Sequence, residues 1–229
     1  MVRYRILLMD ADNTLMDFAK AEREALICAL RAAGVRENEE LICGYSRIND
    51  EMWKRLERGE IDKVSLRTAR FEAFCKEFRL PADPVVLADE YLKSLAEQRF
   101  LMDGVSEVCR KLAEHCRLYI ITNGIAQVQH GRLDTSPIRP YFSGLFISDE
   151  LGVEKPHKAY FDRVAANIPD FDPRSVLVVG DSLTSDIAGG IAAGLDTCWF
   201  NQSGAPVPSD MPITYVIRGL DELLPLVLG

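Results

Sequence analysis

Acidic side chains follow two apolar runs of this sequence, at points where a buried strand would end. Asp10 comes directly after the run at 6–9, and Asp181 follows the run at 176–179 with one glycine between them. Two carboxylates that converge repel each other unless a cation lies between them, and hard oxygen ligands with open positions suit Mg²⁺. Either acid alone is better explained as a helix cap, but the pair predicts a Mg²⁺ site.

A third acid, Asp12, lies two residues beyond Asp10. In near-extended backbone the two side chains point to the same side. One could then act as a nucleophile while the other transfers protons, provided that their environments separate their pKa values. A tight turn here would also direct the backbone carbonyl of Asp12 toward the cation, with Thr14 in support. The alternative is an ordinary Asx turn over residues 12–14, which needs no chemistry.

Hydroxyl and amide groups are expected at the end of the next strand, in the stretch Thr122-Asn123-Gly124. A hydroxyl together with backbone N–H groups suits an anionic oxygen. Thr122 and Asn123 are therefore candidate ligands of an anionic group such as phosphate. Taken by itself, however, the stretch is better explained as a plain strand-to-helix turn in which Gly124 supplies flexibility.

One basic residue, Lys155, precedes Pro156, which biases the lysine toward an extended conformation. Held in this way, Lys155 could project into a cleft as a point charge on a phosphate. The alternative is a solvated surface lysine. Asp186 lies near the start of an expected helix, where the helix dipole favours an acid. It is expected either to complement that dipole or to support the metal through water.

Strand and helix patterns alternate in the second half of the chain. Strands are expected at 118–121, 144–147, 175–179 and 197–200, and helices at 105–114, 127–134, 158–167 and 185–193. Such alternation predicts a doubly wound α/β fold, a parallel sheet with helices on both faces, and the run at 5–9 belongs to it as a first strand. Ligands of such sheets bind beyond the carboxyl ends of the strands, which is where the candidate residues stand.

The region between the first strand and this series has a different character. Residues 17–99 contain almost no β-branched runs, and apolar residues recur at helical spacing over 20–33, 39–58, 64–78 and 84–98. We therefore expect a catalytic core made of residues 1–16 and 100–229. A helical cap at 17–99 would be inserted after the first strand.

The composition restricts the partners and the location. The 229 residues include 27 Lys and Arg against 35 Asp and Glu, a net charge of -8, which argues against nucleic acid and against an anionic membrane surface. The six cysteines form no C-x-x-C pair, so reduced and mostly buried thiols are expected. No apolar stretch reaches the length of a membrane span. We expect a cytoplasmic protein, a monomer or weak homodimer, that needs a bound cation if its substrate is anionic.

Taken in order, these strand ends resemble the four motifs of the haloacid dehalogenase-like (HAD) superfamily. The matching stretches are 10–14, Thr122, Lys155-Pro156, and Gly180-Asp181 with Asp186. The resemblance implies that Asp10 is a nucleophile that forms a phospho-aspartate and that Asp12 is the general acid and base. Thr122 and Lys155 would bind the transferring phosphoryl group. The implied ligands of Mg²⁺ are Asp10, Asp181 and the Asp12 carbonyl, with Asp186 in support.

Within the superfamily, several stretches are similar to YjjG-type pyrimidine 5'-nucleotidases. They are residues 121–124, 147–156, 189–194 and 197–199. This similarity implies dephosphorylation of UMP, dUMP and dTMP and their non-canonical analogues. The helical insert after the first motif resembles the C1-type cap of the superfamily. In the cap, Asn49, Trp53 and Arg67 are candidates for contact with the base or sugar, although Trp53 is better explained by core packing.

Other functions stay open at this point. Phosphatases of phosphoglycolate or sugar phosphates carry similar motifs, and so do phosphotransferases of the β-phosphoglucomutase type. Haloacid dehalogenases share the fold, but a halide leaving group needs no proton whereas an alkoxide does, so Asp12 favours ester hydrolysis. A signalling receiver domain is much shorter and lacks the helical block, and a binding protein with a dead site is disfavoured by the full residue set.

Overall fold

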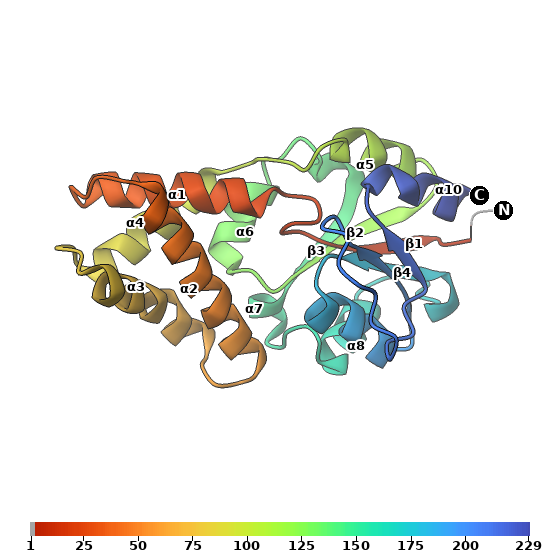
Figure 1. Ribbon diagram of the computed structural model, residues 1–229. Helices are drawn as coiled ribbons and strands as arrows, with labels where there is room; N and C mark the ends of the chain where they lie inside the picture. Colours follow the sequence, from red (N-terminus) through yellow and green to blue (C-terminus); the bar gives the residue numbers. More distant parts are fainter. Residues whose placement is uncertain (1–2) are drawn as a thin grey trace. The chain divides into compact units, whose positions relative to one another are not determined.

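The computed structural model describes residues 3–229 and contains a six-stranded sheet flanked by helices (Figure 1). The strands are β1 (Ile6–Asp10), β2 (Arg117–Thr122), β3 (Phe142–Ile147), β4 (Val176–Gly180), β5 (Asp196–Phe200) and β6 (Tyr215–Ile217). All pairs in this sheet are parallel, which confirms the predicted α/β fold. The edge strand β6 is missing from the prediction because three residues are too few to show a period.

The strand order is β3-β2-β1-β4-β5-β6. The chain therefore moves outward from β1 to β2 and β3, and then returns to build the other half of the sheet from β4. Ligands of doubly wound sheets bind where this order reverses. The register pairs Asp10 with Ile121 and Met9 with Val179, so the ends of β1, β2 and β4 lie side by side at that point.

The strands at the centre of the sheet are buried on both faces, which is why they form continuous apolar runs. Leu7 and Met9 pack on one side with α5 (Val105–Ala113) and α10 (Leu223–Leu228). Ile6 and Leu8 pack on the other side with α8 (Lys158–Ala166). Figure 1 shows α5 and α10 on one side of the sheet and α8 on the other.

The remaining connections of the sheet are short. They contain α6 (Ala126–Leu133), α7 (Ser148–Leu151), α9 (Ala188–Ala192) and the single turns η1 (Arg139–Tyr141), η2 (Pro173–Ser175), η3 (Leu183–Ile187) and η4 (Leu220–Glu222). One helix is expected at 185–193, but the structure has a π-helical turn, η3, that runs into α9. The wider turn accompanies a contact inside the segment, in which Ser182 N donates to Oδ2 of Asp186 at 3.2 Å.

Residues 18–99 form a second compact unit together with residues 130–132. Its helices are α1 (Phe18–Ala32), α2 (Glu39–Glu57), α3 (Lys63–Phe78) and α4 (Pro84–Glu97). The last three begin where a polar side chain accepts a hydrogen bond from the first turn; these capping residues are Asn38, Asp62 and Asp83. The helix bounds agree with the sequence prediction to within two residues.

Aromatic side chains fill the interior of this helical unit. The ring of Tyr45 lies 4.9 Å from that of Phe71 and 5.3 Å from those of Phe74 and Tyr91, centroid to centroid. All four side chains are buried, and rings at this spacing attract one another beyond the effect of burial alone. Among residues 3–229, no helix combines the length and apolarity that crossing a membrane requires.

Candidate active site

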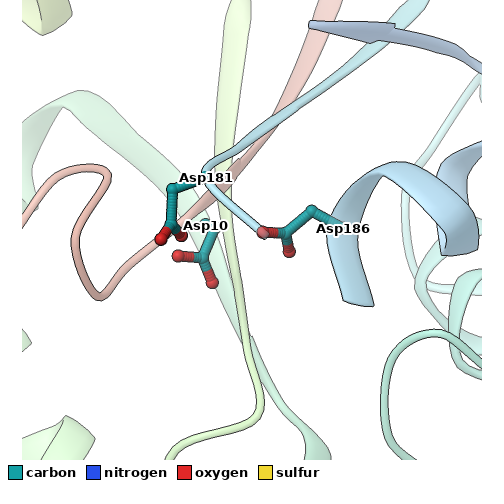
Figure 2. A group of neighbouring side chains, drawn as sticks. All are labelled: Asp10, Asp181 and Asp186. Atoms are coloured by element: carbon teal, nitrogen blue, oxygen red, sulfur yellow. The ribbon is translucent and has the colours of Figure 1, made fainter. Parts of the chain in front are cut away.

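Three carboxylates converge beyond the carboxyl ends of β1 and β4. Asp10 is the last residue of β1, Asp181 follows β4, and Asp186 lies in η3. One oxygen from each lies within 4.8 Å of the others, and Figure 2 shows Asp186 pointing toward the other two. Gly180 permits this approach, because a Cβ at that position would lie 2.2 Å from Oδ2 of Asp186.

Lys155 is the counter-ion of this cluster. Its Nζ donates to Oδ1 of Asp10 and to Oδ1 of Asp186, at 2.7 Å each, and to the carbonyl of Ile121 at 3.1 Å. Only 2 % of the lysine is exposed. The alternative of a solvated surface lysine is therefore wrong.

The cluster carries more negative charge than Lys155 balances. Burial raises the pKa of Asp10 well above its usual range, against the attraction of Lys155. Burial also raises the pKa of Asp181 to about 7, and the neighbouring Asp186 carboxylate adds to the shift. Clustered oxygen donors short of positive charge suit a hard divalent cation, so these residues fit Mg²⁺.

The segment after β1 makes a tight turn. Leu15 N and Met16 N both donate to the carbonyl of Ala11, at 2.9 and 2.8 Å, and Asn13 adopts a left-handed conformation with φ of 59°. Asn tolerates this region better than most residues. The turn leaves Asp12 half-buried and sets the Thr14 hydroxyl 3.5 Å from Oδ1 of Asp181.

The segment after β2 is tied to its neighbours through side chains. The Asn123 amide donates to the carbonyl of Lys155 at 2.8 Å and accepts from its backbone N–H at 2.9 Å. The Asn123 side chain thus fastens the backbone of Lys155. The hydroxyl of Tyr160 accepts a hydrogen bond from the backbone N–H of Thr122 at 3.1 Å. It donates one to the carbonyl oxygen of Phe146 at 2.8 Å.

Three supporting residues were not among the sequence candidates. Tyr160 and Trp199 lie in α8 and β5, and the indole N–H of Trp199 donates to the carbonyl of Asp181 at 2.9 Å. Gln129 in α6 donates to Oδ2 of Asp12 at 2.6 Å and to the Thr122 hydroxyl at 3.0 Å. A polar side chain inside apolar helical spacing was a possible signal for Gln129, whereas Tyr160 and Trp199 look like ordinary core residues.

The sequence that carries these strand ends matches a known protein family. The model of haloacid dehalogenase-like hydrolases matches residues 4–194. The chain belongs to this family. The expected resemblance is thereby confirmed, and the chain is a hydrolase.

Relatives of this hydrolase cover nearly its whole length. The HAD-hydrolase YfnB of Bacillus subtilis is 40% identical over 224 residues, which is 97% of this chain and 95% of YfnB. The pyrimidine 5'-nucleotidase PynA of Streptococcus pneumoniae is 36% identical, with 96% and 94% covered. The pyrimidine 5'-nucleotidase YjjG of Escherichia coli is 33% identical, with 95% of each covered. These names support the predicted enzyme class, a phosphatase of the HAD family.

A solved structure agrees with the fold. The crystal structure of YfnB, described as bound to magnesium, superposes with a TM-score of 0.93 at 38% identity and covers 98% of each chain. At this identity and coverage, the likeness extends through the entire HAD fold.

The remaining candidates of this HAD hydrolase lie in the helical unit. Asn49 is buried, and its amide donates to Oε1 of Glu22 at 2.7 Å and accepts from Arg70 at 2.8 Å. Trp53 and Arg67 are half-buried, and Nε of Arg67 is buried with no hydrogen-bond partner within residues 3–229. These contacts hold Asn49 inside the helical unit, and the substrate contacts of Asn49, Trp53 and Arg67 stay predictions.

Proposed function

We propose that this HAD hydrolase is a Mg²⁺-dependent phosphomonoesterase that acts through a phospho-aspartate, with pyrimidine nucleoside 5'-monophosphates as its substrates. The observation that carries the proposal is the convergence of Asp10, Asp181 and Asp186 around Lys155 at the reversal point of the sheet. A phosphoryl group requires charge neutralisation and in-line positioning more than any other assistance. This cluster offers both, since it holds an ammonium group and has the donors for a divalent cation.

The residues that would hold Mg²⁺ are Asp10, Asp181 and the backbone carbonyl of Asp12, supported by Asp186 and Thr14. The bound cation would neutralise charge on the phosphoryl oxygens. The carboxylate separation of at most 4.8 Å supports this assignment, and so does the magnesium described for the related YfnB structure.

The proposed reaction has two steps. A carboxylate oxygen of Asp10 attacks phosphorus, the ester P–O bond breaks, and Asp12 donates a proton to the departing alkoxide. Asp12, now ionised, takes a proton from water as the water attacks the phospho-aspartate. The bond between phosphorus and Asp10 breaks, which releases inorganic phosphate and restores both acids. Throughout, Thr122, Lys155 and the backbone N–H of Asn123 would hold the phosphoryl oxygens.

The substrate class is supported by the names of the relatives. PynA and YjjG, which this chain matches over at least 94% of their lengths, are named pyrimidine 5'-nucleotidases. Trp53 and Arg67 of the helical unit are also proposed to contact the base or sugar, on the basis of the sequence alone. The two-acid arrangement of Asp10 and Asp12 supports an ester over a halide, because only the ester leaving group needs a proton.

The test is a panel of candidate substrates assayed with Mg²⁺. It contains UMP, dUMP, dTMP, AMP, phosphoglycolate, a hexose 6-phosphate, β-glucose 1-phosphate and a 2-haloacid. We expect phosphate release with the highest kcat/KM on the pyrimidine nucleotides, and none from an Asp10→Asn variant purified in the same way. Preference for phosphoglycolate or the hexose phosphate would replace the proposed substrate class. Isomerisation of β-glucose 1-phosphate without phosphate release, or halide release, would overturn the phosphatase.

A further inference from the structure

Gln129 connects the proposed proton-transfer residue to a proposed phosphate ligand. It lies in α6 with 1 % of its surface exposed. Its Nε2 is 2.6 Å from Oδ2 of Asp12, which is 117 positions away in the sequence, and 3.0 Å from Oγ1 of Thr122. A side-chain amide has two N–H hydrogens, so Gln129 directs both of them at residues of the site.

This contact determines what the Thr122 hydroxyl can do. Its oxygen accepts from Gly124 N at 3.0 Å as well as from Gln129. A hydroxyl has two lone pairs and one hydrogen. With both lone pairs engaged, the hydroxyl of Thr122 acts only as a donor, which is what an anionic phosphoryl oxygen requires.

The same amide holds the carboxyl group of Asp12. Oδ2 of Asp12 accepts a hydrogen bond from Nε2 of Gln129, so the amide presents its NH2 side to this carboxyl group. The carbonyl oxygen of a carboxylic acid and the oxygens of a carboxylate both accept such a bond. The carbonyl Oε1 of Gln129 is buried with no hydrogen-bond partner within residues 3–229. The amide therefore leaves its acceptor unpaired while both of its hydrogens serve Asp12 and Thr122.

Gly124 leaves the space that Gln129 occupies. A Cβ at position 124 would lie 2.1 Å from Nε2 of Gln129 and 2.8 Å from its Cγ and Cδ. The glycine after Thr122-Asn123 is thus explained by close approach of a side chain. The interpretation that Gly124 mainly supplies flexibility does not account for this contact.

We propose that Gln129 is a positioning residue, which orients the carboxyl group of Asp12 for proton transfer and makes the Thr122 hydroxyl an obligate donor to the phosphoryl group. The proposal rests on the phosphatase function proposed above. Its structural alternative is that Gln129 only packs α6 against the core.

Two variants separate these possibilities by kinetics. Gln129→Met keeps the length and bulk of the side chain without its donors, and Gln129→Glu keeps the shape but replaces the donors with acceptors. Hydrogen bonds to charged groups are strong enough that losing one lowers a rate on the order of 10- to 100-fold. We expect a loss of this size in kcat for UMP, larger for Gln129→Glu, with a smaller change in KM, because proton donation assists only the transition state. The control is Gln127→Leu, an exposed glutamine of the same helix, which should retain wild-type kinetics.

Coupling to Asp12 provides a second readout. In an Asp12→Asn background, Gln129→Met should lower the rate less than it does in the wild-type background, since the part of its effect that acts through Asp12 is already lost. Gly124→Ala should reproduce the defect of Gln129→Met, because the added methyl group displaces the amide. Full additivity of the Asp12 and Gln129 changes would contradict the proposal, as would wild-type kcat in Gln129→Met.

A crystal structure of Gln129→Met tests the proposal without relying on activity. We expect the side chains of Asp12 and Thr122 to leave their wild-type rotamers while the backbone of α6 stays in place. Unchanged side chains at both positions would overturn the positioning role even if the enzyme were a phosphatase. If wild-type protein instead releases no phosphate from any ester, the proposed function fails, and the structure still reports on Gln129.

Discussion

The ammonium nitrogen of Lys155 lies 2.7 Å from Oδ1 of Asp10, the carboxylate proposed to attack phosphorus. The contact is almost completely shielded from solvent, and the lysine makes a second bond of equal length to Asp186. An ion pair in such surroundings contributes little net stability, but removing one partner leaves an uncompensated buried charge. Lys155 therefore stabilises the acidic cluster, in addition to its proposed contact with the phosphoryl group.

The first prediction concerns metal removal. With excess chelator, phosphate release should fall below detection, because the carboxylate cluster then lacks its cation and the substrate is not neutralised. Adding Mg²⁺ back should restore the rate, and Ca²⁺, which favours longer bonds and more ligands, should restore it poorly. The measurement is phosphate release from UMP after dialysis against chelator. Full turnover in excess chelator would contradict the metal requirement.

The second prediction compares Asp10 with Lys155. Asp10→Asn should abolish turnover, because it replaces the nucleophilic carboxylate by a neutral amide. Lys155→Ala should retain a weak rate, since the loss of one group that stabilises charge typically lowers kcat on the order of 10²–10³-fold. Unlike Asp10→Asn, Lys155→Ala should also lower the melting temperature of the metal-free protein, as three carboxylates then lack their counter-ion. Equally mild kinetic defects in both variants would refute these assignments.

The third prediction concerns Asp12 and the leaving group. If Asp12 protonates the departing oxygen, Asp12→Asn should slow attack on UMP by about 10²–10⁴-fold, the usual contribution of general acid catalysis. An aryl phosphate leaves as a stabilised phenolate and needs little protonation. Rapid mixing with p-nitrophenyl phosphate should therefore show a burst of phenolate followed by slow turnover, because Asp12 must still activate water. Loss of the burst to the same degree as the UMP reaction would argue against the acid role.

The fourth prediction follows from the buried carboxyls. Burial raises the pKa of Asp181 from 3.8 to about 7 in the folded, metal-free protein. A carboxyl whose pKa is higher in the folded state binds protons more tightly there, so its stabilising effect is present at low pH and is lost as the pH rises toward 7. The melting temperature of the metal-free protein should therefore fall between pH 5 and 7.5, and less steeply in Asp181→Asn. Mg²⁺ should raise the melting temperature more at pH 7.5 than at pH 5, because the cation then competes with fewer protons for the carboxylates.

The fifth prediction concerns Trp199. Its indole N–H donates to the carbonyl of Asp181 at 2.9 Å, and Trp199→Phe removes that donor. We expect a loss of about 0.5–1.5 kcal/mol in the free energy of unfolding, the usual net contribution of one hydrogen bond, together with weaker Mg²⁺ binding by calorimetry. The control is Trp53→Phe in the helical unit, which should leave Mg²⁺ affinity unchanged. Equal effects of both substitutions on Mg²⁺ affinity would contradict a role for Trp199 at Asp181.

The arrangement of the sheet and the helices could be predicted because it follows from the local pattern of apolar residues in the sequence. The apolar runs that end at Asp10 and near Asp181 are typical of strands buried on both faces, and their alternation with helical patterns indicates a parallel sheet. In such a sheet the carboxyl ends of the strands share one edge. The acids, Thr122 and Lys155 could therefore be expected at that edge from the sequence alone.

Side-chain contacts between distant segments were decided only by the tertiary structure. The local sequence gives Gln129 and Lys155 only weak signals, which are the apolar helical spacing around the glutamine and the proline that follows the lysine. Each acquires its role from partners that are far away in the sequence, 117 positions for Gln129 and Asp12 and 145 for Lys155 and Asp10. The sequence by itself determined which chemical groups reach the edge of the sheet, because periodicity and strand direction are local properties. The tertiary structure decided which group bonds to which, because that depends on packing across β1, β2, β4 and the helices between them.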